Sequence, residues 1–253
     1  MDLGLAGRRA LVTGGTKGIG RATAELLAAE GAAVALCARD AGEVAEAVAA
    51  LRARGVSATG RALDVADADA LRDWVGDAGR ELGGLDVVVA NVSALAVGGD
   101  EAAWRAGFDV DMMHSVRAVE AAMPFLEASD AGSVVLVSSV SGREIDFAAG
   151  PYGAFKAALV HYAQGLAHRL APKGIRANAV SPGNTYFEGG VWARIERDDP
   201  ALYASALALN PMGRMGTPEE VARAVVFLAS PAASFVSGTN LVVDGALTRG
   251  VQL

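Results

Sequence analysis

Cysteine is almost absent from this chain, since Cys37 is the only one among 253 residues. A lone cysteine cannot form an internal disulfide, and its scarcity is typical of a reducing compartment, so we expect a cytoplasmic protein. The three histidines, His114, His161 and His168, show no metal-ligand spacing with it. The sequence therefore predicts neither a disulfide framework nor a bound metal.

Long apolar runs and excess positive charge are also missing. No uninterrupted apolar stretch approaches the roughly 18 residues of a membrane-spanning helix, and the opening "MDLGLAGRRALVTGG" does not resemble a signal peptide. The formal net charge of −7 argues against nucleic acid or an anionic membrane as a partner. Only three of the 22 basic residues are lysines, so each lysine is more informative than usual.

The chain instead alternates short apolar runs with helical patterns. Runs typical of strands lie within 9–13, 33–38, 57–65, 85–91, 132–139, 175–183 and 239–245. Helical patterns lie at 21–31, after Asp40, at 67–82, near 101–127 and 152–171, and at 217–230. This alternation predicts an α/β fold with one Rossmann-type, doubly wound parallel sheet of about seven strands, with helices on both faces. No Pro-, Gly- or Ser-rich linker divides the chain, so we expect a single domain over 1–253.

Local signals predict several helix boundaries and one irregular region. Asp40 and Glu43 in "DAGE" predict an N-cap with a capping box, and Thr217 followed by Pro218 predicts another helix start. Residues 184–212 break the rhythm and are rich in aromatic side chains. A long excursion after a strand is more often a binding lid than a necessary connection, so we expect a substrate lid here.

Glycines 14, 15, 18 and 20 in "LVTGGTKGIGRAT" follow the first strand and open a helix. Glycines let the backbone approach a pyrophosphate, and the helix N-terminus supplies N–H groups and a positive dipole end. The spacing G-x-x-x-G-x-G differs from the commoner G-x-G-x-x-G, and a plain structural turn is the alternative. The position in the first unit of a doubly wound sheet favours a dinucleotide site.

The end of the second strand indicates which dinucleotide is bound. An NAD site usually has an acidic residue there to bind the ribose 2′-hydroxyl, but this strand ends at Ala38 and Arg39 follows. Arg39 and Lys17 together can neutralise a 2′-phosphate. Asp40 is the competing acid, and its capping role gives it a structural reason. The pattern favours NADP(H) over NAD(H).

Tyr152 and Lys156 lie four residues apart in a predicted helix and so share one face. A free phenol has a pKa of about 10, and it needs a nearby cation to act as a proton donor near neutral pH. Lys156 supplies that cation. The structural alternative is a buried tyrosine beside a lysine whose stem covers apolar surface.

Four ordered segments, "TGGTKGIG", "SSVSG", "YGAFK" and "VSPG", carry a resemblance to a known family. Together with the tail "GRMGTPEEVARAVVFLAS…FVSGTNLVVDG", they make the chain resemble the short-chain dehydrogenase/reductase family over essentially its whole length. The resemblance is to the branch that includes 3-oxoacyl-carrier-protein reductases.

The resemblance implies roles at matching positions. Ser139 binds the substrate oxygen, Tyr152 donates or accepts the proton, and Lys156 binds the nicotinamide ribose and favours the phenolate. Further cofactor contacts are implied at Gly14, Thr16, Lys17, Gly18, Ile19 and Gly20 of the loop, at Asp64 and Val65 for the adenine, at Asn91 for the cofactor backbone, and at Pro182, Gly183 and Thr185 around the nicotinamide.

Two departures from the family pattern stand out. The usual "NNAG" after the fourth strand is "ANVS" at 90–93, which leaves Asn91 as the single asparagine. In the long helix, "FDVDMM" has Asp111 where the family has a catalytic asparagine. An aspartate can accept the same hydrogen bonds, but a carboxylate beside Lys156 also steadies the ammonium and opposes stabilisation of a phenolate. A helix cap or polar patch is the structural alternative for Asp111.

The residues favour an NADP(H)-dependent ketoreductase or alcohol dehydrogenase acting on a small carbonyl or alcohol. Segments 93–97, 144–147 and 186–203 are expected to frame the substrate pocket. The family resemblance also implies a homotetramer or homodimer, paired through the helices near 101–127 and 152–171.

Two other functions remain open. A 3-oxoacyl-carrier-protein reductase is disfavoured because Glu127 and Asp130 lie where those enzymes tend to have basic residues, and only Lys173 is a partial counterpart. A non-catalytic NADP-binding sensor or scaffold is disfavoured by the intact set of Ser139, Tyr152 and Lys156.

Overall fold

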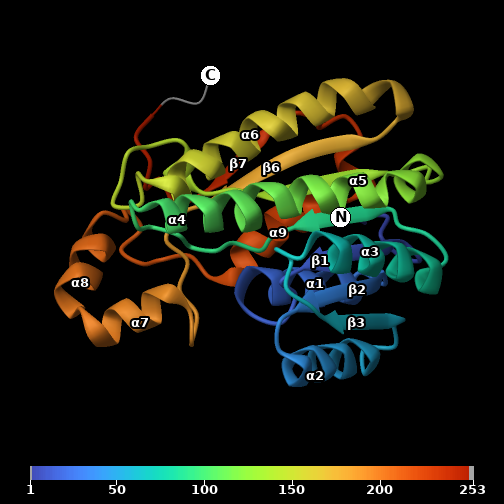
Figure 1. The fold of residues 1–253 in the computed structure, drawn as a ribbon, viewed down its shortest axis with the longest axis horizontal. Coiled ribbons are helices and arrows are strands. Elements are labelled where there is room, and N and C mark those ends of the chain that lie inside the picture. Colours follow the sequence, from blue (N-terminus) through green and yellow to red (C-terminus); the bar gives the residue numbers. More distant parts are fainter. Residues whose placement is uncertain (1, 251–253) are drawn as a thin grey trace.

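Residues 2–250, which the computed structural model describes, form one parallel sheet flanked by helices (Figure 1). Its seven strands are β1 (Arg9–Thr13), β2 (Ala33–Ala38), β3 (Ala58–Ala62), β4 (Val87–Ala90), β5 (Ser133–Val137), β6 (Arg176–Pro182) and β7 (Asn240–Val243). Their order is β3-β2-β1-β4-β5-β6-β7, and every neighbouring pair is parallel. The predicted Rossmann-type sheet is confirmed, and each strand lies inside its predicted range.

Two helical layers cover the sheet. One face packs against α1 (Gly18–Ala29), α2 (Ala41–Arg52) and α9 (Pro218–Ala229). The other packs against α3 (Ala68–Leu82), α5 (His114–Glu127) and α6 (Pro151–Leu170). The central strands β4, β5 and β6 are buried at every residue. They are buried on both sides because the side chains on each face of this parallel sheet meet a helical layer.

The helix starts follow the local signals with one difference. Thr217 and Glu220 form a reciprocal capping box at α9. Asp40 caps α2 by accepting a hydrogen bond from the Glu43 N–H at 2.9 Å. The Glu43 carboxylate does not complete the predicted box, because it reaches the glycine loop and binds Lys17. That half of the prediction is wrong, since the Glu43 carboxylate instead contacts Lys17 and accepts a hydrogen bond from the Thr16 hydroxyl.

The long helix expected near 101–127 has an interruption. A π-helical turn, Gly107–Met113, joins α4 (Glu101–Ala106) to α5. At Gly107, an added Cβ would come within 2.8 Å of the Phe155 ring on α6, so the two helices cross closely at this point. Turns of this kind occur frequently at functional sites, and this one contains Asp111.

Residues 184–212, expected to be irregular, contain two helices, α7 (Val191–Asp198) and α8 (Pro200–Ala208). They pack on each other around the buried side chains of Trp192, Ala206 and Met215. Both lie beyond the carboxyl ends of the strands (Figure 1). Each helix has fewer than ten residues, which is too short for a clear apolar period in the sequence.

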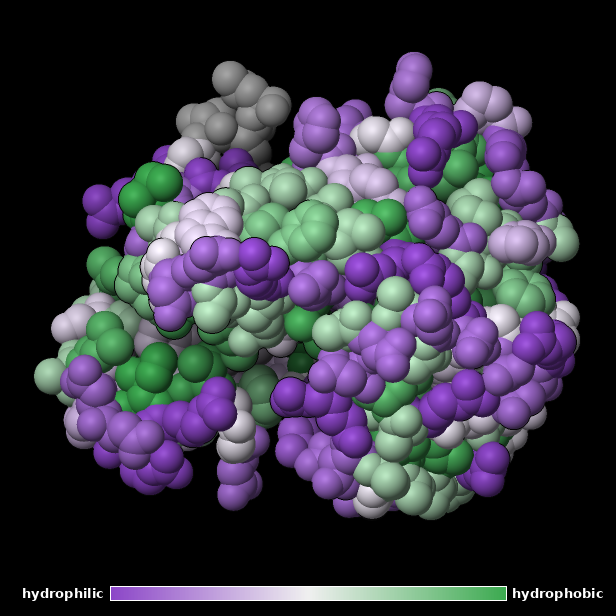
Figure 2. Space-filling model, in the orientation of Figure 1, coloured by the Kyte–Doolittle hydropathy of each residue, from purple (hydrophilic) through white to green (hydrophobic). Residues whose placement is uncertain are grey.

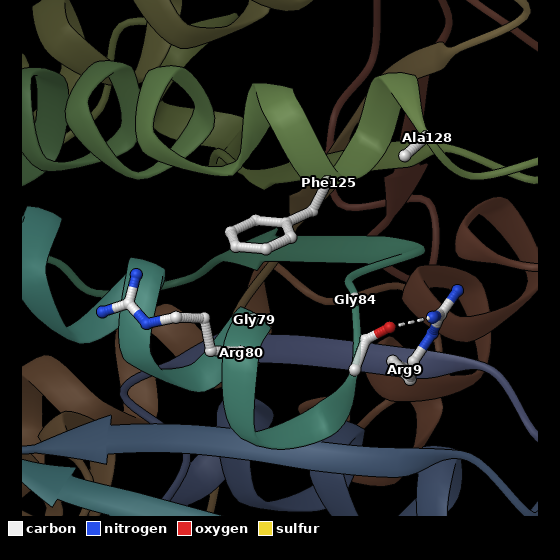
Figure 3. A pocket seen from close by; sticks show the side chains of 7 residues that line it. Arg9, Gly79, Arg80, Gly84, Phe125 and Ala128 are labelled. Atoms are coloured by element: carbon white, nitrogen blue, oxygen red, sulfur yellow. Dashed lines mark hydrogen bonds between the residues drawn. The ribbon is translucent and has the colours of Figure 1, made fainter.

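A pocket of about 310 Å³ opens at the opposite edge of the sheet, where the strands begin (Figure 3). Its lining residues are Arg9, Gly79, Arg80, Gly83, Gly84, Phe125 and Ala128. Arg9 Nη1 donates to the Gly83 carbonyl at 2.6 Å, and its Nε lies 2.8 Å from Asp86 Oδ2. Arg80 pairs with Asp77. Because both arginine charges are neutralised within the fold, the pocket is not a strong anion site.

Candidate active site

The candidate site lies at the carboxyl edge of the sheet, where the strand order reverses. β1 pairs with β2 on one side and with β4 on the other. The chain therefore leaves these strands in opposite directions, and ligands of open α/β sheets bind in the crevice that results. The glycine loop follows β1, and Asn91 follows β4.

The glycine loop has the geometry of a phosphate cradle. Gly14 and Gly18 have positive φ angles of 68° and 52°. A Cβ on Gly20 would lie 2.1 Å from the Gly14 carbonyl oxygen, so only glycine fits there. Helix α1 begins at Gly18 without a side-chain cap, and its first N–H groups can therefore serve a bound anion. Ile19 packs against the core and anchors this helix start.

Asn91 supports the loop from the side of β4. Its backbone N–H donates to Thr13 Oγ1 at 2.9 Å, and its Nδ2 donates to the Thr13 carbonyl at 3.1 Å. Thr13 Oγ1 lies 3.1 Å from Nε2 of His114, whose Nδ1 bonds the Val110 carbonyl. The side chain of Asn91 is thus engaged with the loop itself.

His114 lies beside the candidate site and was not identified from the sequence. Burial lowers the pKa of its imidazole to about 4, so the ring is neutral near pH 7. The bond from Nδ1 to the Val110 carbonyl leaves Nε2 as the acceptor for Thr13. Through these two contacts His114 ties the π-helical turn to the end of β1, where the glycine loop begins. The sequence signal for His114 is its spacing, because it lies three residues after Asp111 and so on the same face of the predicted helix.

The three residues of the expected proton-transfer set come from β5 and α6. Ser139 follows β5 and is buried, and its Oγ accepts the Ser141 N–H at 3.2 Å. Tyr152 and Lys156 lie in the first turns of α6, on the shared face that their spacing predicts. Lys156 Nζ is 5.6 Å from the centroid of the Tyr152 ring and donates to the Val137 carbonyl at 3.0 Å.

Asp111 is buried against this lysine. Its carboxylate is 0% exposed, and Oδ1 lies 3.3 Å from Lys156 Nζ, whose side chain is 2% exposed. Oδ1 receives no aligned hydrogen bond despite that distance, so the contact is mainly electrostatic. Oδ2 accepts the Ala94 N–H at 3.1 Å. These contacts do not fit a helix cap, because Asp111 lies in the middle of the π-helical turn.

The expected 2′-phosphate contacts lie on the side of β2. Arg39 follows β2 and is exposed. Lys17 Nζ lies 2.5 Å from a carboxylate oxygen of Glu43, a neighbour that the sequence analysis missed. Asp64, two residues after β3, is exposed, whereas the Val65 side chain is buried in the core. Any contact of Val65 with an adenine would therefore come from its backbone.

The expected nicotinamide contacts lie at the end of β6. Pro182 is the last residue of that strand, and the Gly183 N–H donates to the Val243 carbonyl at 2.9 Å. Thr185 is buried, and its hydroxyl donates to the Gly183 carbonyl at 3.1 Å. These bonds hold the turn against β7.

The segments expected to frame the substrate pocket expose apolar side chains near this edge. Leu95, Val97, Ile145 and Phe147 are all exposed. The Phe147 ring meets Trp192 of α7 edge to face at 5.8 Å, which joins 144–147 to 184–212. Figure 2 shows the surface hollowed between the α7–α8 region and the part that carries α1 and α2.

Comparison with known proteins decides the family. A family model described as "Enoyl-(Acyl carrier protein) reductase" matches residues 14–248, and a solved structure of a short-chain oxidoreductase from Pseudomonas aeruginosa superposes with a TM-score of 0.87. The chain belongs to the short-chain dehydrogenase/reductase family. The Pseudomonas protein is 34% identical over 96% of this chain and 98% of its own, is NADPH-bound, and is described as containing an atypical catalytic center.

Two curated members of the short-chain dehydrogenase/reductase family are still more similar in sequence. Isoepoxydon dehydrogenase of Penicillium expansum is 41% identical over 100% of this chain and 99% of its own length. Cis-4-hydroxycyclohexanecarboxylate dehydrogenase of Sinomonas cyclohexanicum is 39% identical over 98% of this chain and 99% of its own length. The chain is accordingly an oxidoreductase of this family.

Two further findings concern residues 2–250 of this short-chain dehydrogenase/reductase. No helix in that range is both long and apolar enough to cross a membrane. No three His, Cys, Asp or Glu side chains in that range gather closely enough to hold a metal ion.

Proposed function

We propose that this chain is an NADP(H)-dependent ketoreductase or alcohol dehydrogenase. Bound NADP(H) would supply or accept the hydride at a carbonyl or carbinol carbon. The observation that carries the proposal is the arrangement of Tyr152 and Lys156 on one face of α6, with Lys156 Nζ 5.6 Å from the centroid of the Tyr152 ring. Ser139 enters the same region from β5.

The chain's own residues account for the proton side of the reaction. The Ser139 hydroxyl accepts the Ser141 N–H, so its proton can be donated to a substrate oxygen. Tyr152 exchanges the proton with that oxygen. Lys156 is held by the Val137 carbonyl and by Asp111, which keep its ammonium group beside the Tyr152 ring.

We propose Asp111 as a positioning residue in this set. Its two oxygens reach two different parts of the site, Lys156 and the backbone of Ala94. Ala94 belongs to the segment expected to frame the substrate pocket, where Leu95 adopts a positive φ of 49°. Asp111 therefore fixes the lysine and the pocket segment relative to each other.

The residues present fit NADP(H). Phosphate oxygens can bind at the uncapped start of α1, and the glycines leave room for them. Gly14 to Gly20, Asn91, Asp64, Val65, Pro182, Gly183 and Thr185 would line the cofactor. Arg39 and Lys17 would face the 2′-phosphate, and the NADPH bound to the Pseudomonas relative supports that choice. We predict that Arg39→Asp shifts preference towards NAD(H), and an unchanged ratio of affinities would contradict it.

We propose a small cyclic alcohol or ketone as the substrate. The named substrate of the Sinomonas relative is a hydroxycyclohexane that carries a carboxylate. The exposed apolar side chains Leu95, Val97, Ile145 and Phe147 suit a carbocycle. We further propose that 184–212 is the lid over this pocket, within a single domain, because Trp192 contacts Phe147 at the pocket edge.

A 3-oxoacyl-carrier-protein reductase is less well supported. Lys173, the partial counterpart of the basic carrier-binding residues, lies 2.5 Å from Glu127 and is neutralised by it. Asp130 pairs with Arg8. An acidic carrier protein would therefore find little net positive charge near the start of β5.

One experiment tests the proposed activity against both alternatives. NADPH oxidation is measured with cyclic ketones, including 4-oxocyclohexanecarboxylate, and with a 3-oxoacyl carrier protein. Wild type should reduce the cyclic ketones, and Tyr152→Phe should lose about 10²- to 10⁴-fold of that activity. Full activity in Tyr152→Phe would contradict the proposed role of Tyr152 in proton transfer. Tight NADPH binding without turnover of any carbonyl would favour a sensor or scaffold.

We also propose a homotetramer or homodimer. Trp104 and Phe108 are exposed, and both rings contact Phe155 on α6, at 5.8 and 6.1 Å between centroids. This aromatic patch lies on the helices expected to pair. Light scattering coupled to gel filtration tests the assembly, and a monomeric mass at micromolar concentration would contradict it.

A further inference from the structure

The 2′-phosphate side of the proposed cofactor site already contains a carboxylate. One oxygen of Glu43 lies 2.5 Å from Lys17 Nζ, and the other accepts a hydrogen bond from the Thr16 hydroxyl at 3.2 Å. Lys17 and Thr16 belong to the glycine loop, whereas Glu43 lies in the first turn of α2. Glu43 thus connects the loop directly to α2.

Two other charged residues, Asp40 and Arg39, lie near Glu43 in the sequence. The Asp40 carboxylate caps α2 by accepting the Glu43 N–H. Arg39 is exposed beside it at the end of β2. The Lys17 and Glu43 side chains are 66% and 33% exposed, and an ion pair that accessible contributes little to stability. Lys17 can therefore leave Glu43 at low cost when a stronger anion arrives.

We propose that Glu43 is a specificity-determining residue that competes internally with the cofactor's 2′-phosphate for Lys17. The carboxylate occupies the cation that the phosphate would use, and after exchange it remains a negative charge close to the phosphate. Both effects weaken binding of a 2′-phosphate and leave a 2′-hydroxyl almost unaffected. Glu43 thereby limits the preference for NADP(H) over NAD(H). The inference rests on the proposed cofactor, which Lys17 and Arg39 would recognise.

Nucleotide fragments isolate this effect from catalysis. Isothermal titration calorimetry at low salt measures the affinity of 2′,5′-ADP, which carries the 2′-phosphate, and of 5′-AMP, which lacks it. Glu43→Gln should bind 2′,5′-ADP about three- to tenfold more tightly than wild type, with 5′-AMP changed by less than about twofold. The gain should shrink in about 0.5 M salt, because these charges are exposed.

Two control variants sharpen the test. Glu46→Gln removes the same charge from an exposed position one turn further along α2, and it should leave both affinities nearly unchanged. In a Lys17→Met background, Glu43→Gln should lose most of its effect on 2′,5′-ADP, since the two side chains act on one another. Circular dichroism confirms that each variant is folded.

The results of these titrations distinguish a wrong role for Glu43 from a wrong choice of cofactor. An unchanged or weaker affinity of Glu43→Gln for 2′,5′-ADP would overturn the role of Glu43, even if wild type prefers NADPH. Weaker binding of 5′-AMP would also overturn it, because Glu43 would then be a ligand of the ribose hydroxyl. A preference for 2′,5′-ADP that appears only in Glu43→Gln would support the role of Glu43 and contradict NADP(H) as the wild-type cofactor.

Discussion

The buried pair of Asp111 and Lys156 leads to a quantitative prediction, because neither charge is in contact with bulk water. The two side chains are 0% and 2% exposed and lie 3.3 Å apart. Asp111→Ala removes the ion-pair partner of Lys156 and the acceptor of the Ala94 N–H. Breaking a buried ion pair costs about 3–5 kcal/mol, so we expect the free energy of unfolding to fall by about that amount.

Asp111→Asn is the milder perturbation. Its amide oxygen can keep the bond to the Ala94 N–H, and only the charge opposite Lys156 is lost. We expect a loss of about 1–3 kcal/mol, the cost of leaving a buried polar group poorly compensated. The Val137 carbonyl continues to accept from Lys156 Nζ in this variant.

Chemical denaturation at a fixed protein concentration measures both losses. A double-mutant cycle with Asp111→Asn and Lys156→Met isolates the interaction of the two charges from effects on other neighbours. We expect a coupling free energy of about 1–3 kcal/mol. A coupling below about 0.5 kcal/mol would refute the reasoning, because additive effects mean that the two groups do not interact.

Three further predictions concern the supporting structure. Burial lowers the pKa of His114 to about 4, so an unfolded chain with a pKa of about 6.5 binds protons more readily between these values. The contribution of neutral His114 to the free energy of unfolding is therefore complete above a pH of about 6.5, and up to about 3 kcal/mol is lost as the pH falls towards 4. In His114→Gln the free energy of unfolding should depend less on pH in this range, and equal slopes for the variant and wild type would contradict the prediction. Arg176→Ala should lower the free energy of unfolding by about 3 kcal/mol, because the guanidinium bonds the buried carbonyls of Leu228, Ala229 and Ser230, and an unchanged denaturation midpoint would refute this. Gly20→Ala should weaken NADPH binding about tenfold or more by fluorescence titration, whereas Gly165→Ala, where an added Cβ meets nothing within 4 Å, should not; equal affinities would contradict the cradle.

The central strands β4 and β5 could be predicted from the sequence because they are short, mainly apolar runs that are buried on both faces. In β5, all five residues are buried between the helical layers. Such a run is visible without any knowledge of its neighbours. By contrast, the π-helical turn Gly107–Met113 begins where Gly107 lies close to Phe155 of α6. The local sequence contains no pattern that predicts the contact between Gly107 and Phe155.

In the candidate site, too, some contacts follow from local spacing and others depend on the tertiary fold. The four-residue spacing of Tyr152 and Lys156 places both on one face of any helix, so their pairing needs no tertiary information. The contact of Thr13 with His114 joins segments far apart in the chain, and the contact of Lys17 with Glu43 depends on how α2 returns to the glycine loop. The capping-box pattern predicts a local partner for the Glu43 carboxylate, but in the fold that carboxylate contacts Lys17 and Thr16 of the glycine loop.

Transfer of deuterium from NADPH to a ketone is a direct test of the proposed hydride transfer. The protein is incubated with NADPH that carries deuterium on the reactive face of nicotinamide C4 and with a cyclic ketone that it reduces, and the alcohol is examined by mass spectrometry. We predict an alcohol one mass unit heavier, with deuterium on the carbinol carbon, and almost no such alcohol from Tyr152→Phe. An alcohol without deuterium from either face of the ring, or equal product from Tyr152→Phe, would contradict it.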